Sequence, residues 1–230
     1  LSAVAYMKNV QYFTFPGVAT TFRNETWNDT LTDLTWTFSN NAANPVYASS
    51  AHSTALTAFA NSFTDPGWVD MKMTATGNNT GDTTVEWPHA VFVTDATGVD
   101  ATTYYQDFSG ADTTKWPMFN YYNNEFKWQW ANVGYGDNSS GKYDGFDARV
   151  NDLTGDYPNT GMPAGDFDDF FSVPVDLSSF TGSCSLNYFF SGATRSTNAL
   201  DMNDTLVIEY SINKSQTWTT LAKLTRSQLD

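Results

Sequence analysis

Cysteine is almost absent from this chain of 230 residues, because Cys184 is the only one. A chain with one cysteine forms no internal disulfide, which disfavours a small disulfide-stapled ectodomain. Cys184 is instead expected to be a small buried side chain beside Leu186 and Tyr188. Long apolar runs are also missing. No stretch of about 18 consecutive apolar residues occurs, so no membrane-spanning helix is predicted.

Basic residues are scarce as well. The chain has 11 lysines and arginines against 25 aspartates and glutamates, a formal net charge of -14. A charge of this sign repels phosphate backbones, and no basic stripe interrupts it, so nucleic-acid binding is not expected. The same field attracts cations and favours solubility outside the cell.

Motifs for catalysis are lacking too. The two histidines, His52 and His89, are far apart in the sequence, and no His-Glu-x-x-His motif or Gly-x-Ser-x-Gly elbow occurs. Asp168 and Asp169 form a carboxylate pair, but neighbours on a strand point to opposite faces and do not flank one glycosidic bond. No catalytic residues are therefore predicted, and this chain is not expected to be an enzyme by itself.

The residues that are abundant indicate an all-β protein. Thr, Val, Tyr, Phe and Trp are frequent, and Gly, Asn, Asp and Pro recur at short intervals. Strands are predicted at Ala19–Phe22, Leu34–Phe38, Trp68–Thr76, Thr83–Val85 and Ala90–Val93. The clean alternation from Trp68 to Ala75 predicts that Asp70 and Lys72 share the solvent side. Ser53–Asn61 is the one segment expected to form a short helical turn.

A small, polar segment at 94–102 has the composition of a linker. It divides the chain into two predicted domains, 1–95 and 96–230. Both halves carry more acids than bases, so neither is a basic arm.

Four segments follow one another in the first half: Val18–Phe22, Leu34–Asn41, Asn44–Tyr47, and Asp65–Asn78 with Gly81. In this order they resemble the strands of a PKD-type immunoglobulin-like β-sandwich. The resemblance covers residues 10–94 and implies that fold. Thr37 and Ser39–Asn41 replace the acidic, glycine-rich turn of that family, so a function of the turn does not carry over. Trp36 and Phe38 alternate with threonines, as a sandwich-core strand requires.

The second half carries another ordered series: Tyr104–Ser109, Lys115–Pro117, Phe126–Trp130, Asp168–Ser178, Leu186–Phe190, Asp204–Ser211 and Thr217–Trp218. This order resembles MAM-like and cleaved-adhesin-like jelly rolls, although Ser109 stands where Glu is usual and Val173 where Ser or Thr is usual. A jelly roll needs about eight strands and only about five or six are predicted here. The domain is therefore expected to be incomplete at its C-terminal end, unless another chain completes the sheet.

A calcium site is predicted from the acids of the second half. Eight aspartates lie between residues 137 and 169, with Lys142 and Arg149 as the only cations. Calcium takes six to eight oxygen ligands, which flexible acidic loops supply. The jelly-roll resemblance also implies a structural ion near the acid before the Leu-x-x-Pro strand. It points to these ligands for structural calcium: Asp107, Asp166, Asp168 and Asp169. The alternative is a solvated acidic loop that only aids solubility.

Aromatic residues crowd the segment from Trp116 to Trp130. Tyr121 and Tyr122 adjoin two asparagines and are the candidates for an exposed sugar-stacking platform. The alternative is that they pack in the core or in a turn.

The order of the two halves is similar to the region after the catalytic domain in pappalysin/cytophagalysin-type secreted bacterial metalloproteases. That resemblance implies a non-catalytic accessory region, secreted or at the cell surface, whose zinc site lies upstream of this chain. It would provide calcium-stabilised spacing and bind an extracellular protein or polysaccharide. Two alternatives stay open, namely a carbohydrate-binding module and an adhesin or cell-surface structural repeat.

Overall fold

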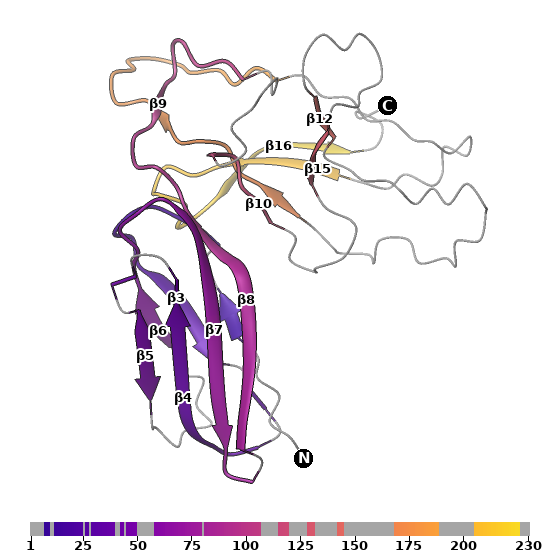
Figure 1. Cartoon of the computed structure of the whole chain (residues 1–230). Helices are drawn as coiled ribbons and strands as arrows, with labels where there is room; N and C mark the ends of the chain where they lie inside the picture. Colours follow the sequence, from indigo (N-terminus) through magenta and orange to yellow (C-terminus); the bar gives the residue numbers. More distant parts are fainter. Residues whose placement is uncertain are drawn as a thin grey trace, which may run out of the picture. The chain divides into compact units, whose positions relative to one another are not determined.

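The computed structural model describes residues 7–9, 12–24, 26–27, 29–39, 42–43, 45–49, 58–79, 81–106, 115–119, 128–131, 142–144, 168–188 and 205–225. Within these residues the structure has β-strands and no α-helix, which confirms the all-β part of the predicted fold class (Figure 1). None of the described residues forms a helix long and apolar enough to cross a membrane. The chain divides into two compact units: residues 1–97 with 211–217, and residues 98–210 with 218–230.

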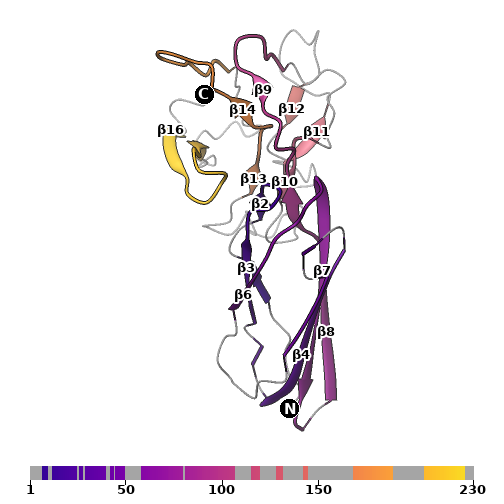
Figure 2. The same ribbon diagram turned by 90° about the vertical axis from the view of Figure 1, so that its left-hand side faces the viewer.

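Unit 1 is built from two sheets. The larger has the order β2-β8-β7-β4-β5, with strands at Phe13–Thr14, Gly81–Val93, Gly67–Gly77, Leu31–Phe38 and Val46–Ser49. The smaller has the order β1-β3-β6, with strands at Met7–Asn9, Thr20–Asn24 and Ala58–Asn61. All these pairings are antiparallel except that of β2 with β8. Figure 2 shows β3 and β6 lying against the layer that contains β4, β7 and β8.

The core of unit 1 lies between the two sheets. Phe22 of β3 packs its ring 6.1 Å from that of Trp36 and 5.0 Å from that of Phe38, both on β4. Phe22 and Trp36 are fully buried. Burying an aromatic side chain of this size contributes about 1.5–3 kcal/mol. The predicted alternation of apolar and threonine positions in β4 is therefore confirmed.

Strand β7 shows the same alternation. Val69, Met71 and Met73 are buried, whereas Asp70 and Lys72 are exposed as predicted. On the exposed face Lys72 Nζ lies 3.1 Å from a carboxylate oxygen of its cross-strand partner Glu86.

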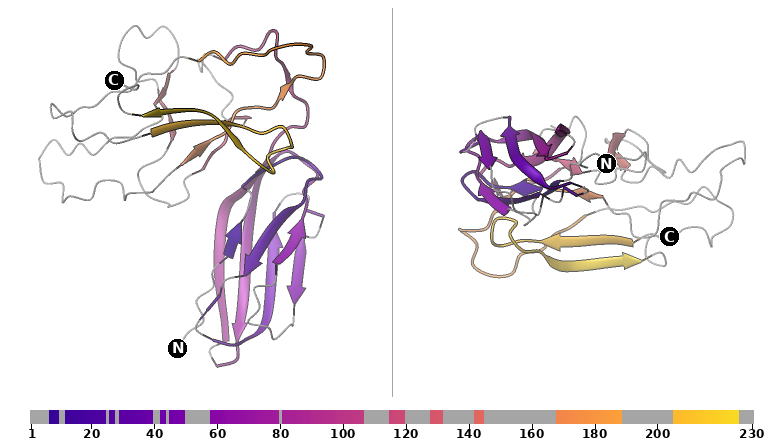
Figure 3. Two further views of the ribbon diagram at one scale, coloured as in Figure 1. Left: turned by 180° about the vertical axis from the view of Figure 1, so that it is seen from behind. Right: turned by 90° about the horizontal axis from the view of Figure 1, so that it is seen from below.

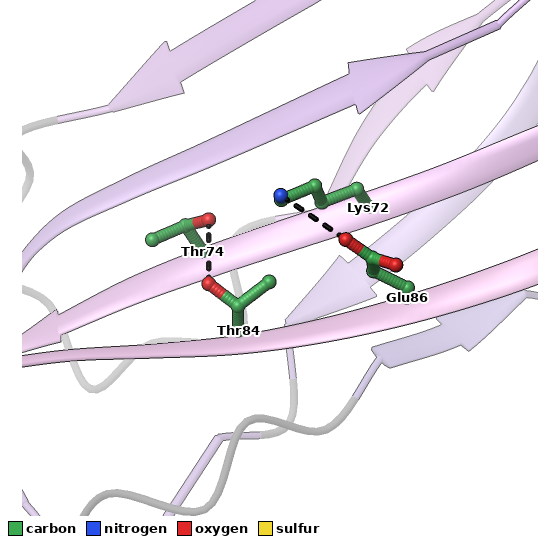
Figure 4. Close-up of polar contacts among 4 residues, drawn as sticks. All are labelled: Lys72, Thr74, Thr84 and Glu86. Atoms are coloured by element: carbon green, nitrogen blue, oxygen red, sulfur yellow. Dashed lines mark hydrogen bonds and ion pairs between the residues drawn. The ribbon is translucent and has the colours of Figure 1, made fainter.

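Two residues farther along the same ladder, the hydroxyls of Thr74 and Thr84 are 3.0 Å apart (Figure 4). Such exposed pairs fix register but contribute little stability.

Two expectations for unit 1 were wrong. Thr83–Val85 and Ala90–Val93 are parts of a single strand, β8. Pro88 is accommodated by a bulge, because a proline that lacks an N–H fits where the ladder is interrupted. The second error concerns Ser53–Asn61, where a helical turn was expected. Its described part, Ala58–Asn61, is strand β6, whose pairing with β3 outweighs its local helix propensity.

Unit 2 contains short paired strands. In the described residues, β9 at Val99–Asp100 runs parallel to β14 at Val175–Asp176, and β10 at Met118–Phe119 is antiparallel to β13 at Asp169–Phe170. β11 at Gln129–Ala131 pairs with β12 at Lys142–Asp144. The longest pair is the hairpin of β15 at Thr205–Tyr210 and β16 at Thr219–Thr225 (Figure 3). The jelly-roll topology stays a prediction.

Candidate functional site

The predicted calcium ligands fall partly outside the described residues. Asp107 and Asp166 are not described, and neither are the candidate sugar-binding residues Tyr121 and Tyr122. Asp168 is half-buried and directly precedes β13, where Asp169 lies opposite Phe119. The carboxylate oxygens of these two aspartates have the right chemistry for calcium.

The main chain at Asp168 is held by an aromatic neighbour. The indole Nε1 of Trp128 donates a hydrogen bond of 2.9 Å to the Asp168 carbonyl oxygen. The Trp128 ring also lies 5.7 Å from that of Phe170 at 32°. The backbone at the predicted metal ligand Asp168 is therefore held by a half-buried tryptophan that packs on Phe170.

These rings belong to an aromatic row formed by Tyr104, Trp116, Phe170 and Trp128. The ring centroids of Trp116 and Phe170 are 5.2 Å apart at 29°, and those of Tyr104 and Trp116 are 6.4 Å apart at 15°. Near-parallel offset rings at these distances are favourable beyond the area they bury. All four side chains are half-buried, and burial raises the pKa of the Tyr104 hydroxyl. The row is a packing feature that connects Phe170 of β13 with the rings of Trp116, Tyr104 and Trp128.

Phe171 packs away from this row. Its ring contacts that of Phe119 at 5.4 Å and that of Trp218 at 5.4 Å, both edge to face. Adjacent residues Phe170 and Phe171 therefore tie β13 to two different aromatic groups. The sequence pattern Asp-Asp-Phe-Phe marked a strand, but it did not show which rings each phenylalanine would meet.

The strand pairing brings together two acids that were not predicted as a site. In the parallel pair of β9 and β14, Asp100 lies opposite Asp176. Gly98 permits this approach, because a Cβ at that position would lie 2.7 Å from the Asp176 backbone nitrogen. Each acid has a Ser or Thr two positions later, a spacing typical of Asx turns that was visible in the sequence.

Hydrogen bonds hold both carboxylates in their charged form. Asp100 Oδ1 accepts bonds of 2.8 Å from the backbone N–H and from the hydroxyl of Thr102, which lower its pKa despite the nearby negative charge of Asp176. Asp176 Oδ1 accepts a bond of 2.8 Å from the Ser178 N–H, which lowers its pKa. Among the described residues, no three His, Cys, Asp or Glu side chains are grouped closely enough to hold a metal ion.

Another cluster lies at the bulge of unit 1. The backbone N–H of His89 donates a hydrogen bond of 2.7 Å to Asp70 Oδ1. The His89 ring stacks on Trp68 with centroids 4.8 Å apart at 28°. His89 has φ of 55°, a conformation that residues other than glycine rarely adopt. The bulge thus presents an exposed imidazole beside a half-buried indole.

The expectation for Cys184 was wrong, because its side chain is exposed. It lies within residues 177–188, all of which are exposed. Leu186 and Tyr188, the expected packing neighbours, are 61% and 39% exposed. Alternation with apolar residues therefore did not indicate burial here.

Comparisons with protein-family models, with curated proteins and with solved structures found no match for this chain. The resemblances of the two halves to PKD-type and jelly-roll domains therefore stay predictions.

Proposed function

We propose that this chain is a non-catalytic accessory region of a secreted multidomain bacterial protein, with a PKD-like sandwich followed by a jelly-roll-like domain. Its role is to space other parts of that protein and to engage an extracellular protein or polysaccharide. The resemblance to the region after the catalytic domain of secreted metalloproteases suggests that setting.

The observation that carries the spacing role is the hairpin of β7 and β8. Strand β8 has 13 residues. At a rise of about 3.3 Å per residue it extends for roughly 40 Å. Cross-strand partners continue along it from Gly67↔Val93 to Gly77↔Gly81, interrupted only at the bulge. A ladder of this length over a buried core makes a stiff element, which is what a spacer requires.

Structural calcium is part of the proposal. Its support is the acid-rich composition and the carboxylate chemistry of Asp168 and Asp169, whose backbone is fixed by Trp128 and by pairing with β10. A bound ion would neutralise these acids and tie the segment before β13 to its surroundings.

Thermal unfolding with calcium and with a chelator tests this part. We expect chelation to lower the midpoint by about 5 °C or more, and added calcium to restore it. The double variant Asp168→Asn/Asp169→Asn is expected to lose this response, whereas Asp65→Asn, an exposed acid in unit 1, is expected to keep it. An unchanged midpoint in chelator would refute the calcium site and leave the spacing role to be tested separately.

Carbohydrate binding is a second candidate, favoured by the exposed aromatic rings of unit 2. Tyr105 is 78% exposed, Tyr210 45% and Trp218 41%. Exposed rings of this kind can stack on sugars. Pull-down on a panel of insoluble polysaccharides, beside immobilised extracellular matrix proteins, separates glycan binding from adhesion.

Retention on a polysaccharide that Tyr105→Ala and Tyr121→Ala/Tyr122→Ala each weaken would support a glycan-binding module. Retention on matrix proteins alone would support the adhesin alternative. Trp27→Ala is a control, because Trp27 is an exposed aromatic of unit 1, 60% accessible, that the glycan proposal does not use.

A further inference from the structure

The two edges of the larger sheet of unit 1 differ. At one edge β2 is covered, because the Ser215 hydroxyl donates a buried hydrogen bond of 2.8 Å to the Phe13 carbonyl oxygen. At the other edge lies β5, which pairs only with β4 among the described strands (Figure 1). An edge strand of this kind presents backbone N–H and C=O groups that can pair with another chain.

The register of β5 shows which of its backbone groups point away from the sheet. Phe38 N–H donates to the Pro45 carbonyl oxygen at 3.0 Å, in the register that β4 and β5 continue from there. Hydrogen-bonded and non-hydrogen-bonded positions alternate along an antiparallel pair. The backbone of Tyr47 therefore faces β4, whereas Val46 and Ala48 turn their N–H and C=O groups outward. Pro45 lacks an N–H only on the side of β4, so it does not block the free edge.

The sequence and register of β5 do not protect this edge. Lysines, outward-facing prolines and bulges are the usual protection of an edge strand. Strand β5 contains no lysine, and its register with β4 continues without a shift from Thr37↔Val46 to Leu34↔Ser49. Val46 is 59% exposed, and Ala48 is exposed too. Within the described residues the edge is therefore regular, uncharged and accessible.

The distribution of charge also distinguishes this side of unit 1. No Asp, Glu, Lys or Arg occurs between Asp33 and Asp65, although the whole chain has a formal net charge of -14. This stretch contributes most of β4 and all of β5 and β6. The neighbours of the exposed β5 residues on β4 are the uncharged Thr35 and Thr37. Two copies of an acidic chain repel each other where acids meet, but at this edge they approach without bringing acids together.

We propose that β5 is a homotypic edge, at which the β5 strands of two copies of this chain pair antiparallel and join their larger sheets. With a two-fold axis at Tyr47, Val46 of one copy lies opposite Ala48 of the second copy, and the symmetry repeats this pair. Opposite residues of this kind exchange two backbone hydrogen bonds. The edge is thus complementary to itself, so the occupant that it fits is a second copy.

The size of the contact makes this pairing weak and reversible. A stable interface buries about 1,600 Å² in total, and a strand of 4 residues supplies less. Pairing becomes extensive where copies are crowded, because tethering raises their effective concentration to about the mM range. The inferred function is to cluster copies side by side on a surface. It goes beyond the proposed spacing role and needs neither calcium nor a glycan.

Sedimentation velocity of the full chain in a Cys184→Ser background tests this self-association. Between about 10 µM and about 1 mM, we expect the weight-average mass to rise from that of one 25.5 kDa chain towards that of two. Removing the thiol excludes dimers linked by a disulfide. A chain that stays monomeric at every concentration would overturn self-pairing and leave the edge to an extended segment of another protein.

Two double variants test whether β5 is the contact. Val46→Lys/Ala48→Lys and Val46→Glu/Ala48→Glu each place like charges directly opposite one another, so we expect both to stay monomeric. An equimolar mixture pairs opposite charges and is expected to regain the dimer, which variants that had failed to fold would not do. Thr84→Lys, at an exposed position of β8, is the control and should dimerise as the parent does. A dimer that persists in either double variant alone, or a mixture that stays monomeric, would refute pairing at β5.

Cysteine cross-linking tests the antiparallel register. In the Cys184→Ser background, Val46→Cys on one copy lies opposite Ala48→Cys on the other. Opposite Cα atoms of a hydrogen-bonded pair are about 5.5 Å apart, within reach of a disulfide. Under mild oxidation we expect a mixture of the two single variants to cross-link about ten-fold faster than either variant alone. Equal rates in the mixture and in the separate variants would rule out this register.

Discussion

Asp70 holds the bulge in β8 through a hydrogen bond of 2.7 Å from the His89 N–H to its Oδ1. The register passes from Val69↔Val91 to Met71↔Trp87, so Asp70 alone faces residues 88–90. The backbone of Asp70 also binds β4's end, since its N–H donates to Ser39 Oγ at 2.7 Å. One exposed acid therefore supplies a hydrogen-bond acceptor at the bulge, where the ladder between β7 and β8 is interrupted.

Asp70→Ala is expected to lower the free energy of unfolding of unit 1 by about 1 kcal/mol, because the His89 N–H loses its acceptor. Urea denaturation followed by tryptophan fluorescence measures this change. Asp65→Ala, which removes an exposed acid of unit 1 outside the bulge, is the control for removing a surface charge. If both variants unfold at the same urea concentration, Asp70 does not anchor the bulge.

Gly98→Ala is expected to destabilise unit 2 by about 1–3 kcal/mol, the usual cost of forcing atoms into a filled space. The added Cβ would lie 2.7 Å from the Asp176 backbone nitrogen, and β14 has to move away from β9 to relieve the contact. Thermal unfolding by circular dichroism is the measurement, with the exposed neighbour Ala96→Ser as the control. A midpoint equal to that of the parent protein would show that the parallel pair is not this close.

The pKa values of Asp100 and Asp176 predict a loss of stability in acid. Hydrogen bonds from Thr102 and Ser178 lower the folded pKa of these groups below the ordinary value of 3.8. Their contribution is therefore present above about pH 4 and is lost as the pH falls through the lowered folded values.

Urea unfolding at a series of pH values between about 5 and 2 checks this sign. We expect Asp100→Asn/Asp176→Asn to unfold with a smaller dependence on pH in this window than the parent protein. Thr102→Val, which keeps the backbone bond but removes the hydroxyl, should give an intermediate dependence. A double variant as sensitive to acid as the parent would assign the effect to other carboxylates.

Trp128→Phe is expected to cost about 1 kcal/mol, because the ring stays against Phe170 while the Asp168 carbonyl loses its indole donor. Trp218→Phe is the matched control, since it also removes an indole nitrogen but keeps a ring at Phe171. The calcium response of the melting midpoint should also weaken in Trp128→Phe if Asp168 binds the ion. Equal stability of the two variants would show that the hydrogen bond contributes nothing measurable.

Much of unit 1 was predictable from the sequence because its strands have a strict two-residue period. The apolar positions of β4 and β7 alternate with threonines or charged residues, and the structure buries the apolar ones. The pattern failed at Pro88, where two predicted strands are one, because a bulge depends on the partner strand and not on local preference. It also failed at Cys184, because the alternating residues around it do not form a strand and are exposed.

The candidate site depends more heavily on tertiary structure. Asp168 and Asp169 were recognised from a motif, but the bond that fixes Asp168 comes from Trp128, 40 positions away. Asp100 and Asp176 were not recognised as a pair, because neither sequence segment indicates that β9 pairs with β14. All four predicted calcium ligands stay predictions, and two of them, Asp107 and Asp166, lie outside the described residues.

By itself the sequence determined the all-β class, the acidic charge and the buried faces of β4 and β7, because composition and period act locally. Only the tertiary structure decided that β2 lies parallel to β8, that Ala58–Asn61 joins β3, and that Gly98 admits Asp176. These relationships join residues distant in sequence. The free energy that stabilises them comes from contacts that form only after the chain has closed the intervening loops.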